Sequence, residues 1–269
     1  MTINVTAPSI TAAPVSTNVC ANSAATFSVS ATGNGPLGYM WRKRGTGWPT
    51  GWTLNVGGGG FFVFNSTSNN GGDPASNGGN DINTGGDAWG LFNTGGGVTE
   101  ALRPFPSALG VGQTFSIDMD NGKFVDGTVG FGLQNSGSGL NRLEIYFVSG
   151  NGDYTISDGS GTHDSGVAFT DAGINVLIRL TGADTYAVTI TRYIDGASRS
   201  FAGTLANSEA VDRVRLFDAN GVGGSDRDLY FNNLRVGCAD DNAADAAYNS
   251  GWNNGDNGGQ VPPLKYWRL

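Results

Sequence analysis

Hydrophobic residues alternate with polar ones in many short stretches of this chain. The alternation is clear in TFSVSAT (26–32) and LGYMWRK (37–43), which the turn sequence GNGP separates. It recurs at 60–65, 88–93, 113–119, 128–134, 142–148, 174–181, 185–193, 212–217 and 228–236. Turn-forming pairs such as Asn151-Gly152, Asp158-Gly159 and Asp195-Gly196 lie between these stretches. Short strands at regular spacing predict an all-β chain folded as an antiparallel sandwich or barrel.

The loops between the predicted strands consist largely of Gly, Asn, Asp, Ser and Thr, and residues 65–87 form the longest of them. Gly adopts positive φ without a steric penalty, and Asn and Asp close turns through their own side chains. Only 14% of residues are charged, which disfavours a helical protein, because Lys and Glu fill exposed helix faces. The hydrophobic strand residues can bury enough surface to oppose disorder.

Residues 45–237 resemble a concanavalin A-like jelly roll of the kind found in bacterial surface proteins and glycan-degrading enzymes. The resemblance rests on DINTGGDAWGLF, FSIDMDNG, VGFGLQN and the closing stretch LYFNNLRVG. It implies an antiparallel β-sandwich. We therefore expect an extracellular or cell-surface protein, present here as a segment of something longer.

Residues 1–44 resemble the opening of a bacterial immunoglobulin-like domain, with a proline-rich first strand, Cys20 on the second strand and Trp41 on the third. The later strands of such a domain do not follow. These strands therefore either pack on the next domain or form half of a sandwich completed from elsewhere. Cys20 and Cys238 can pair, which would contribute about 5 kcal/mol through loop closure, or remain unpaired thiols.

The tail, 238–269, contains NSGWNNGDNGG, which resembles the first segment of the same jelly-roll type, normally placed before a segment such as GTGWPTGWTLN (45–55). The chain could be one period of a tandem array, a circular permutation, or a subunit whose tail completes a neighbour. In the third case the tail adds a strand to another copy and builds a head-to-tail homopolymer. The assembly residues would be Tyr248, Trp252, Tyr266 and Trp267.

The formal net charge is -8, which argues against nucleic acid and anionic lipid as partners. No stretch approaches the ~20 apolar residues that span a bilayer, so membrane insertion is not expected.

No catalytic constellation is evident. Enzymes of the concanavalin A-like class carry a Glu-x-Asp-x-x-Glu strand, whereas here Glu144 is followed by Ile145 and Tyr146. We interpret Glu144 as a solvated or hydrogen-bonded strand residue. His163 is the only histidine, which excludes a multi-histidine zinc site. The sequence therefore predicts that the chain is not an enzyme.

Calcium is the one cofactor with a physical case, because it takes six to eight oxygen ligands from carboxylates, amides and loop carbonyls. Asp226 and Asp228 form one possible cluster, which we interpret rather as turn residues. The other lies in the longest loop, where calcium and a plain turn role are equally supported: Asp73, Asn80, Asp81, Asn83 and Asp87.

Glycan binding requires exposed aromatic rings together with polar groups for the sugar hydroxyls. The candidates lie in or beside loops rich in Gly and Asn, and Trp252 is the one expected to be most exposed: Trp48, Trp52, Trp89 and Trp252. The sequence thus predicts a non-catalytic module that binds glycan or mediates adhesion. The alternative is a structural subunit that polymerises through its tail.

Overall fold

The computed structural model describes residues 9–13, 26, 28–33, 40–42, 48, 50–66, 81–122, 126–221, 223–224, 227–237, 239–258 and 266–268. The chain divides into two compact units. One comprises residues 1–45 and 261–269, and the other comprises residues 46–260.

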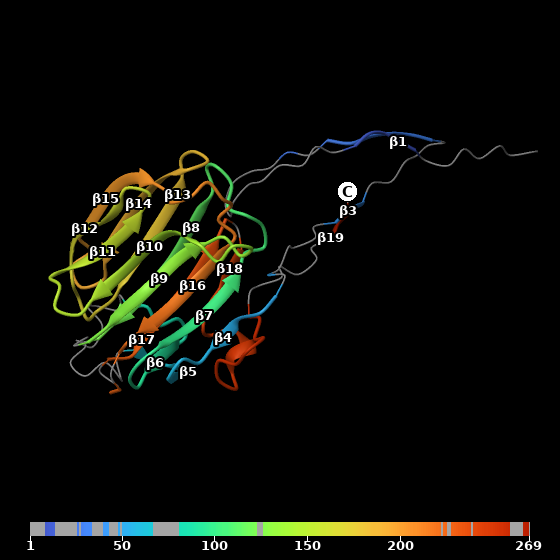
Figure 1. Cartoon of the computed structure of the whole chain (residues 1–269). Coiled ribbons are helices and arrows are strands. Elements are labelled where there is room, and N and C mark those ends of the chain that lie inside the picture. The colour runs from blue at the N-terminus through green and yellow to red at the C-terminus, as the bar shows by residue number, and fades with distance from the viewer. Residues whose placement is uncertain are drawn as a thin grey trace, which may run out of the picture. The chain divides into compact units, whose positions relative to one another are not determined.

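The larger unit is a sandwich of two antiparallel sheets (Figure 1). The 7-stranded sheet has the order β12-β11-β10-β9-β16-β7-β4. Its strands are β4 (Thr53–Asn55), β7 (Val98–Pro104), β9 (Thr128–Gln134), β10 (Asn141–Val148), β11 (Asp153–Asp158), β12 (Gly161–Ala168) and β16 (Arg213–Ala219). The predicted antiparallel β-sandwich is confirmed.

The 8-stranded sheet has the order β15-β14-β13-β8-β17-β6-β5, and a short strand, β18, pairs with β17. Its strands are β5 (Gly59–Phe64), β6 (Ala88–Asn93), β8 (Thr114–Asn121), β13 (Ile174–Leu180), β14 (Thr185–Arg192), β15 (Ser198–Thr204), β17 (Leu229–Val236) and β18 (Ala239–Asp241).

The core lies between the sheets, where each strand turns its hydrophobic positions. Phe115, Ile117 and Met119 of β8 are fully buried, as are Val129, Phe131 and Leu133 of β9. Because side chains of a strand alternate between its two faces, the intervening residues point away from the core. Neighbours such as β9 and β16 are far apart in sequence, so the sheet brings together outward side chains from distant segments.

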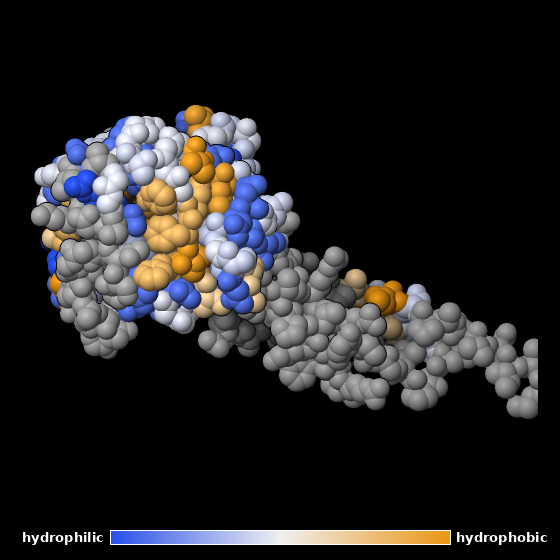
Figure 2. All heavy atoms as spheres, turned by 90° about the horizontal axis from the view of Figure 1, so that it is seen from below, coloured by the Kyte–Doolittle hydropathy of each residue, from blue (hydrophilic) through white to orange (hydrophobic). Residues whose placement is uncertain are grey.

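The outward face of the 8-stranded sheet carries an aromatic cluster near β5 and β6. The Phe62 ring packs against Tyr230, with 5.4 Å between ring centroids. Phe62 also lies directly over Gly90, where a Cβ would come within 2.2 Å of the ring, so this position requires glycine. Figure 2, a view from below, shows hydrophobic residues gathered on one part of the body and bordered by hydrophilic ones.

The smaller unit contains two pairs of strands. β1 (Ser9–Ala12) pairs with β2 (Ser30–Thr32), and β3 (Met40–Arg42) pairs with β19 (Tyr266–Arg268), with Trp267 opposite Trp41. The described parts of the strands predicted at 26–32 and 37–43 therefore pair with β1 and β19. The immunoglobulin-like resemblance of this segment stays a prediction.

Residues 239–258 belong to the same compact unit as the sandwich, whereas the sequence predicts a domain that ends at residue 237. After β18 the chain forms a single 3-10 turn, η2 (Ala246–Tyr248). It then runs beside β4. Here the backbone N–H of Trp52 donates to the Asp256 carbonyl at 2.9 Å, and the backbone N–H of Gly255 donates to the Trp52 carbonyl at 2.7 Å. This part of the tail thus packs against its own chain.

Candidate functional site

The four tryptophans predicted to bind ligand are buried. Trp48, Trp52, Trp89 and Trp252 are 5%, 1%, 0% and 3% exposed. Trp52 contacts both Trp89 and Trp252 edge to face, with 5.3 and 5.1 Å between ring centroids. The expectation that Trp252 is exposed is wrong, because the tail returns to the sandwich and packs the Trp252 ring against Trp52, Trp89 and Phe61. These residues stabilise the fold and present no ring to a ligand.

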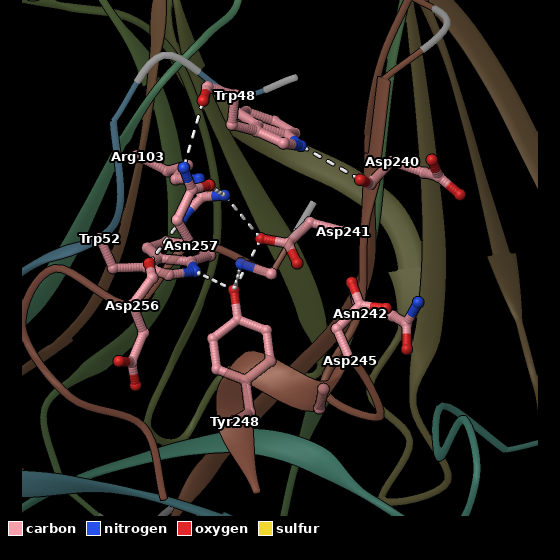
Figure 3. A network of polar contacts seen from close by, with 12 residues as sticks. Trp48, Trp52, Arg103, Asp240, Asp241, Asn242, Asp245, Tyr248, Asp256 and Asn257 are labelled. Carbon is pink, nitrogen blue, oxygen red and sulfur yellow. Dashed lines mark hydrogen bonds and ion pairs between the residues drawn. The ribbon is translucent and has the colours of Figure 1, made fainter. Parts of the chain in front are cut away.

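A buried arginine fixes the tail at this place (Figure 3). Arg103 of β7 forms an ion pair with Asp241 at 2.9 Å, and both side chains are fully buried. Its guanidinium also donates to the Asp256 carbonyl at 3.0 Å and to Asn257 Oδ1 at 2.8 Å. The cation lies 4.7 Å from the Trp48 ring centroid. A single charged side chain therefore connects β7 to three points of the tail.

Tyr248 completes this network. Its hydroxyl donates to Asp241 Oδ2 at 2.8 Å and accepts from Trp52 Nε1 at 3.0 Å. Burial raises the pKa of Asp241 to about 7, although Arg103 acts in the opposite direction. Of the four predicted assembly residues, Tyr248 and Trp252 pack inside their own chain. Tyr266 and Trp267 lie on β19, whose backbone pairs with β3 of the same chain.

The predicted calcium loop is only partly described, since Asp73 and Asn80 lie outside the described residues. Asp226, of the other candidate cluster, also lies outside them. Asn83 uses its amide to hold Ser66, accepting from the Ser66 N–H at 2.9 Å and donating to its hydroxyl at 3.0 Å. Asp81 accepts from the Asn83 N–H at 2.8 Å, and Asp87 bridges to Thr84 through backbone hydrogen bonds. These three therefore act as turn residues here. Within the described ranges, no group of three His, Cys, Asp or Glu side chains could hold a metal.

Calcium binding by this loop stays a prediction. A disulfide between Cys20 and Cys238 also stays a prediction, because both cysteines lie outside the described residues.

A different set of residues converges on the outward face of the 7-stranded sheet, which we call the polar face. Its side chains come from β7, β9, β10 and β16, and they are shielded although they point away from the core. Gln134 and Phe217 are each 4% exposed. On the outward face of the other sheet, by contrast, Leu177 is 43% exposed. The polar face is formed by Glu100, Gln134, Glu144, Tyr146, Arg213, Arg215 and Phe217.

Strand register explains how these residues meet. Arg215 and Glu144 both lie opposite Gly132 of β9, one on each side of it. Phe217 and Tyr146 flank Gly130 in the same way. Because β9 places glycines at both positions, no side chain separates β16 from β10. A Cβ at Gly132 would come within 3.3 Å of Glu144 Cγ.

Arg215 bridges two glutamates across the polar face. Its Nε donates to Glu100 Oε2 at 2.5 Å, and its NH1 lies 3.8 Å from Glu144 Oε1. The three side chains are 18–23% exposed. The guanidinium also stacks over the Phe217 ring, 4.6 Å from its centroid. The interpretation of Glu144 as a solvated strand residue is therefore incomplete, since this carboxyl is partly buried beside a cation.

The pKa values of the two glutamates are shifted in opposite directions. Burial raises the pKa of Glu144, and Arg215 offsets this only in part. For Glu100, burial also acts to raise the pKa, but hydrogen bonds from Arg215 and Asn55 outweigh it and the net pKa is lowered. A pair of carboxyl groups with pKa values shifted in opposite directions is suited to proton transfer, in which one group donates a proton and the other accepts one.

A cavity of about 430 Å³ lies at the edge of the same sheet, lined by residues 150–153, Thr155 and residues 162–164. Thr155 lies opposite Asp164 across the β11–β12 pair. Burial and the nearby Asp164 carboxyl raise the pKa of Asp153. The cavity is therefore an acidic recess beside the loop that joins β10 to β11.

Sequence reasoning missed the polar face because its residues belong to strands that are neighbours only in the folded sheet. A partial signal existed: alternation in the predicted strands at 142–148 and 212–217 places Glu144, Tyr146, Arg213 and Arg215 opposite the hydrophobic positions.

No protein-family model matches the chain, and no curated protein matches it either. Solved structures do. A carbohydrate esterase from Shiga toxin-encoding bacteriophage phi24B has 14% identity and a TM-score of 0.44, covering 69% of this chain and 89% of its own. The CBM2 module of Lactobacillus casei BL23 phage J-1 evolved Dit has 18% identity and a TM-score of 0.40, covering 74% and 97%. The carbohydrate binding module CBM66 from Bacillus subtilis has 12% identity and a TM-score of 0.37, covering 69% and 94%.

Two alginate lyases, a polysaccharide lyase of family 18, a lectin-like defense protein from Phaseolus vulgaris and lectin II from Ulex europaeus are matched as well. These matched structures have identities of 7–18% and TM-scores of 0.32–0.44, and they bear on fold alone. The prediction that the chain is not an enzyme requires correction. The matched structures include a carbohydrate esterase and alginate lyases.

Proposed function

We propose that this chain is an extracellular glycan-binding module whose ligand lies on the polar face. The observation that carries the proposal is the shielded set formed by Arg215, Glu100, Glu144 and Tyr146. Sugar hydroxyls both donate and accept hydrogen bonds, and carboxylates, guanidinium groups and amides offer partners for both. Tyr146, partly exposed, adds a ring on which the apolar face of a sugar can stack.

The arrangement is preorganised for such a ligand. Gln134 accepts from Arg213 Nε at 3.0 Å, and Asn55 donates to Glu100 Oε1 at 2.9 Å. These bonds hold the polar groups in place on strands, and rigid strands position binding groups more accurately than loops do. Less conformational entropy is then lost when a ligand binds.

The proposal is tested by a glycan array with the purified chain, followed by calorimetry on the glycans retained. We expect Tyr146→Ala to weaken binding about tenfold, the loss of one stacking contact worth about 1.4 kcal/mol. Leu177→Ala, an exposed position on the other sheet, should leave affinity unchanged. Equal affinities for both variants would place the ligand elsewhere, and an array without bound glycans would overturn the proposal.

The same mixtures should be analysed for shortened glycans, because the opposite pKa directions of Glu100 and Glu144 suit proton transfer. The extracellular location is part of the proposal and is supported by the loop composition. Among the residues that the structure describes, none forms a helix with the length and hydrophobicity that crossing a bilayer requires.

A further inference from the structure

Two rows of outward side chains run across the 7-stranded sheet, perpendicular to its strands. The first passes from Phe217 over Gly130 to Tyr146, Thr155 and Asp164. Each step in this row is a pair of residues directly opposite each other on adjacent strands. It crosses from β16 to β12, four strand spacings or about 19 Å.

The second row lies beside the first. It passes from Arg215 over Gly132 to Glu144, Ser157 and Thr162. The first row begins at Phe217 and the second at Arg215, which stacks over Phe217 and contacts Glu100 and Glu144; we call these four residues the arginine bridge. Both rows end at residues that line the cavity, Asp164 and Thr162. The arginine bridge and the cavity are thus the two ends of one polar track across the sheet.

The negative charge of this track is least compensated at its cavity end. Glu100 and Glu144 both contact Arg215. Asp153 and Asp164 line the cavity, whose lining holds no arginine or lysine, and Arg199 and Arg192 act on Asp153 from outside that lining. A ligand bearing a carboxylate on each sugar would meet like charge at the cavity end, and like charges are repelled strongly where water is partly excluded.

We propose that the ligand is an uncharged glycan chain that lies across β16, β9, β10, β11 and β12, with one end in the cavity lined by Thr162 and Asp164. This inference rests on the proposed function, and it adds the length, the direction and the charge class of the ligand. Hydroxyls of an uncharged chain can donate to the carboxylates that would repel a polyuronate.

The test compares uncharged oligosaccharides (cello-, xylo- and laminari-series, from the disaccharide upward) with oligomannuronates of the same lengths, by calorimetry. We expect affinity for one uncharged series to rise with chain length and oligomannuronates to bind at least about tenfold more weakly. Thr162→Trp fills the cavity mouth from an exposed position. This substitution should lower the affinity for the longest chains about tenfold and leave the affinity for the disaccharide unchanged.

The matched control is Thr204→Trp, an exposed threonine on the edge strand β15 of the other sheet, which should bind every chain as the unmodified protein does. If Tyr146→Ala weakens binding but Thr162→Trp does not, the cavity end of the inference is wrong and the proposed function stands. Equal or tighter binding of oligomannuronate overturns the charge class. If no series binds to the unmodified protein, the proposed function itself fails.

Discussion

Replacing Arg103 with methionine is expected to lower the free energy of unfolding by about 3–5 kcal/mol at pH 8. The side chain is fully buried and is paired with Asp241, so its removal leaves a buried carboxylate without its cation. Methionine retains much of the packing volume between Trp48 and Trp52. The loss therefore reports the charge and the hydrogen bonds to the tail, and urea unfolding measures it.

The size of this loss should depend on pH. The pKa of Asp241 is about 7 with Arg103 present, and it rises further once Arg103 is removed. At pH 5 the carboxyl is then protonated and the variant should lose clearly less than at pH 8. Arg213→Met, which removes a half-buried arginine from the polar face, should cost no more than about 1 kcal/mol at either pH.

A second variant keeps this prediction decisive if Arg103→Met unfolds. In Arg103→Met with Asp241→Asn no charge is buried, so part of the stability should return. A double variant that is as unstable as the single one would show that packing against the tryptophans, and not the unpaired charge, accounts for the loss.

Much of the sandwich could be predicted from the sequence because the inward positions of its central strands are hydrophobic. All nine strands expected after residue 45 are present, and β6 and β9 have the predicted bounds, 88–93 and 128–134. The turn pairs Asp158-Gly159 and Asp195-Gly196 do separate β11 from β12 and β14 from β15. Alternation is a strong signal where one face of the strand is buried.

Three of the strands that were missed, β7, β12 and β15, lack that signal. β7 turns Thr99, Ala101 and Arg103 inward, so the residues of its buried face do not form a hydrophobic pattern in the sequence. β12 and β15 are sheet edges with mostly exposed residues. Because β7 carries both Arg103 and Glu100, missing it concealed the attachment of the tail and one end of the polar face.

The tryptophans show a different limit. Gly and Asn around a tryptophan indicate a loop, but they do not say whether another segment covers that loop. Trp52 and Trp252 are 200 residues apart, yet their rings are 5.1 Å apart in the fold. That contact depends on the return of the tail along β4, which no local pattern encodes. The sequence left open whether the tail acts within its own chain or on a neighbour; residues 239–258 pack against their own chain.

Asp218→Asn is expected to make the protein more stable at alkaline pH. Asp218 points into the core from β16 and is 1% exposed, and its Oδ1 has no hydrogen-bond partner among the described residues. Burial raises its pKa from 3.8 to about 7, although backbone N–H groups of Asn93 and Gly221 act against this. The folded state therefore resists an ionisation that the unfolded chain undergoes freely.

The direction of this pH dependence follows from the linkage between protonation and folding. Between about pH 4 and pH 7 the unfolded chain has lost this proton while the folded protein keeps it. The contribution of Asp218 to stability is thus complete below pH 4 and declines as pH rises to about 7, by about 4 kcal/mol in total. Asparagine has no such ionisation, and its amide can donate to the Thr99 hydroxyl, which lies directly opposite and is also unpartnered within the described residues.

Urea unfolding from pH 4 to pH 8 measures this pH-dependent difference in stability. Relative to the unmodified protein, Asp218→Asn should gain stability progressively toward pH 8, by up to about 4 kcal/mol. Asp195→Asn, in the exposed turn between β14 and β15, should follow the unmodified curve. A difference between Asp218→Asn and the unmodified protein that stays constant with pH would mean that Asp218 is ionised in the fold throughout, and that its carboxylate has a partner beyond the described residues.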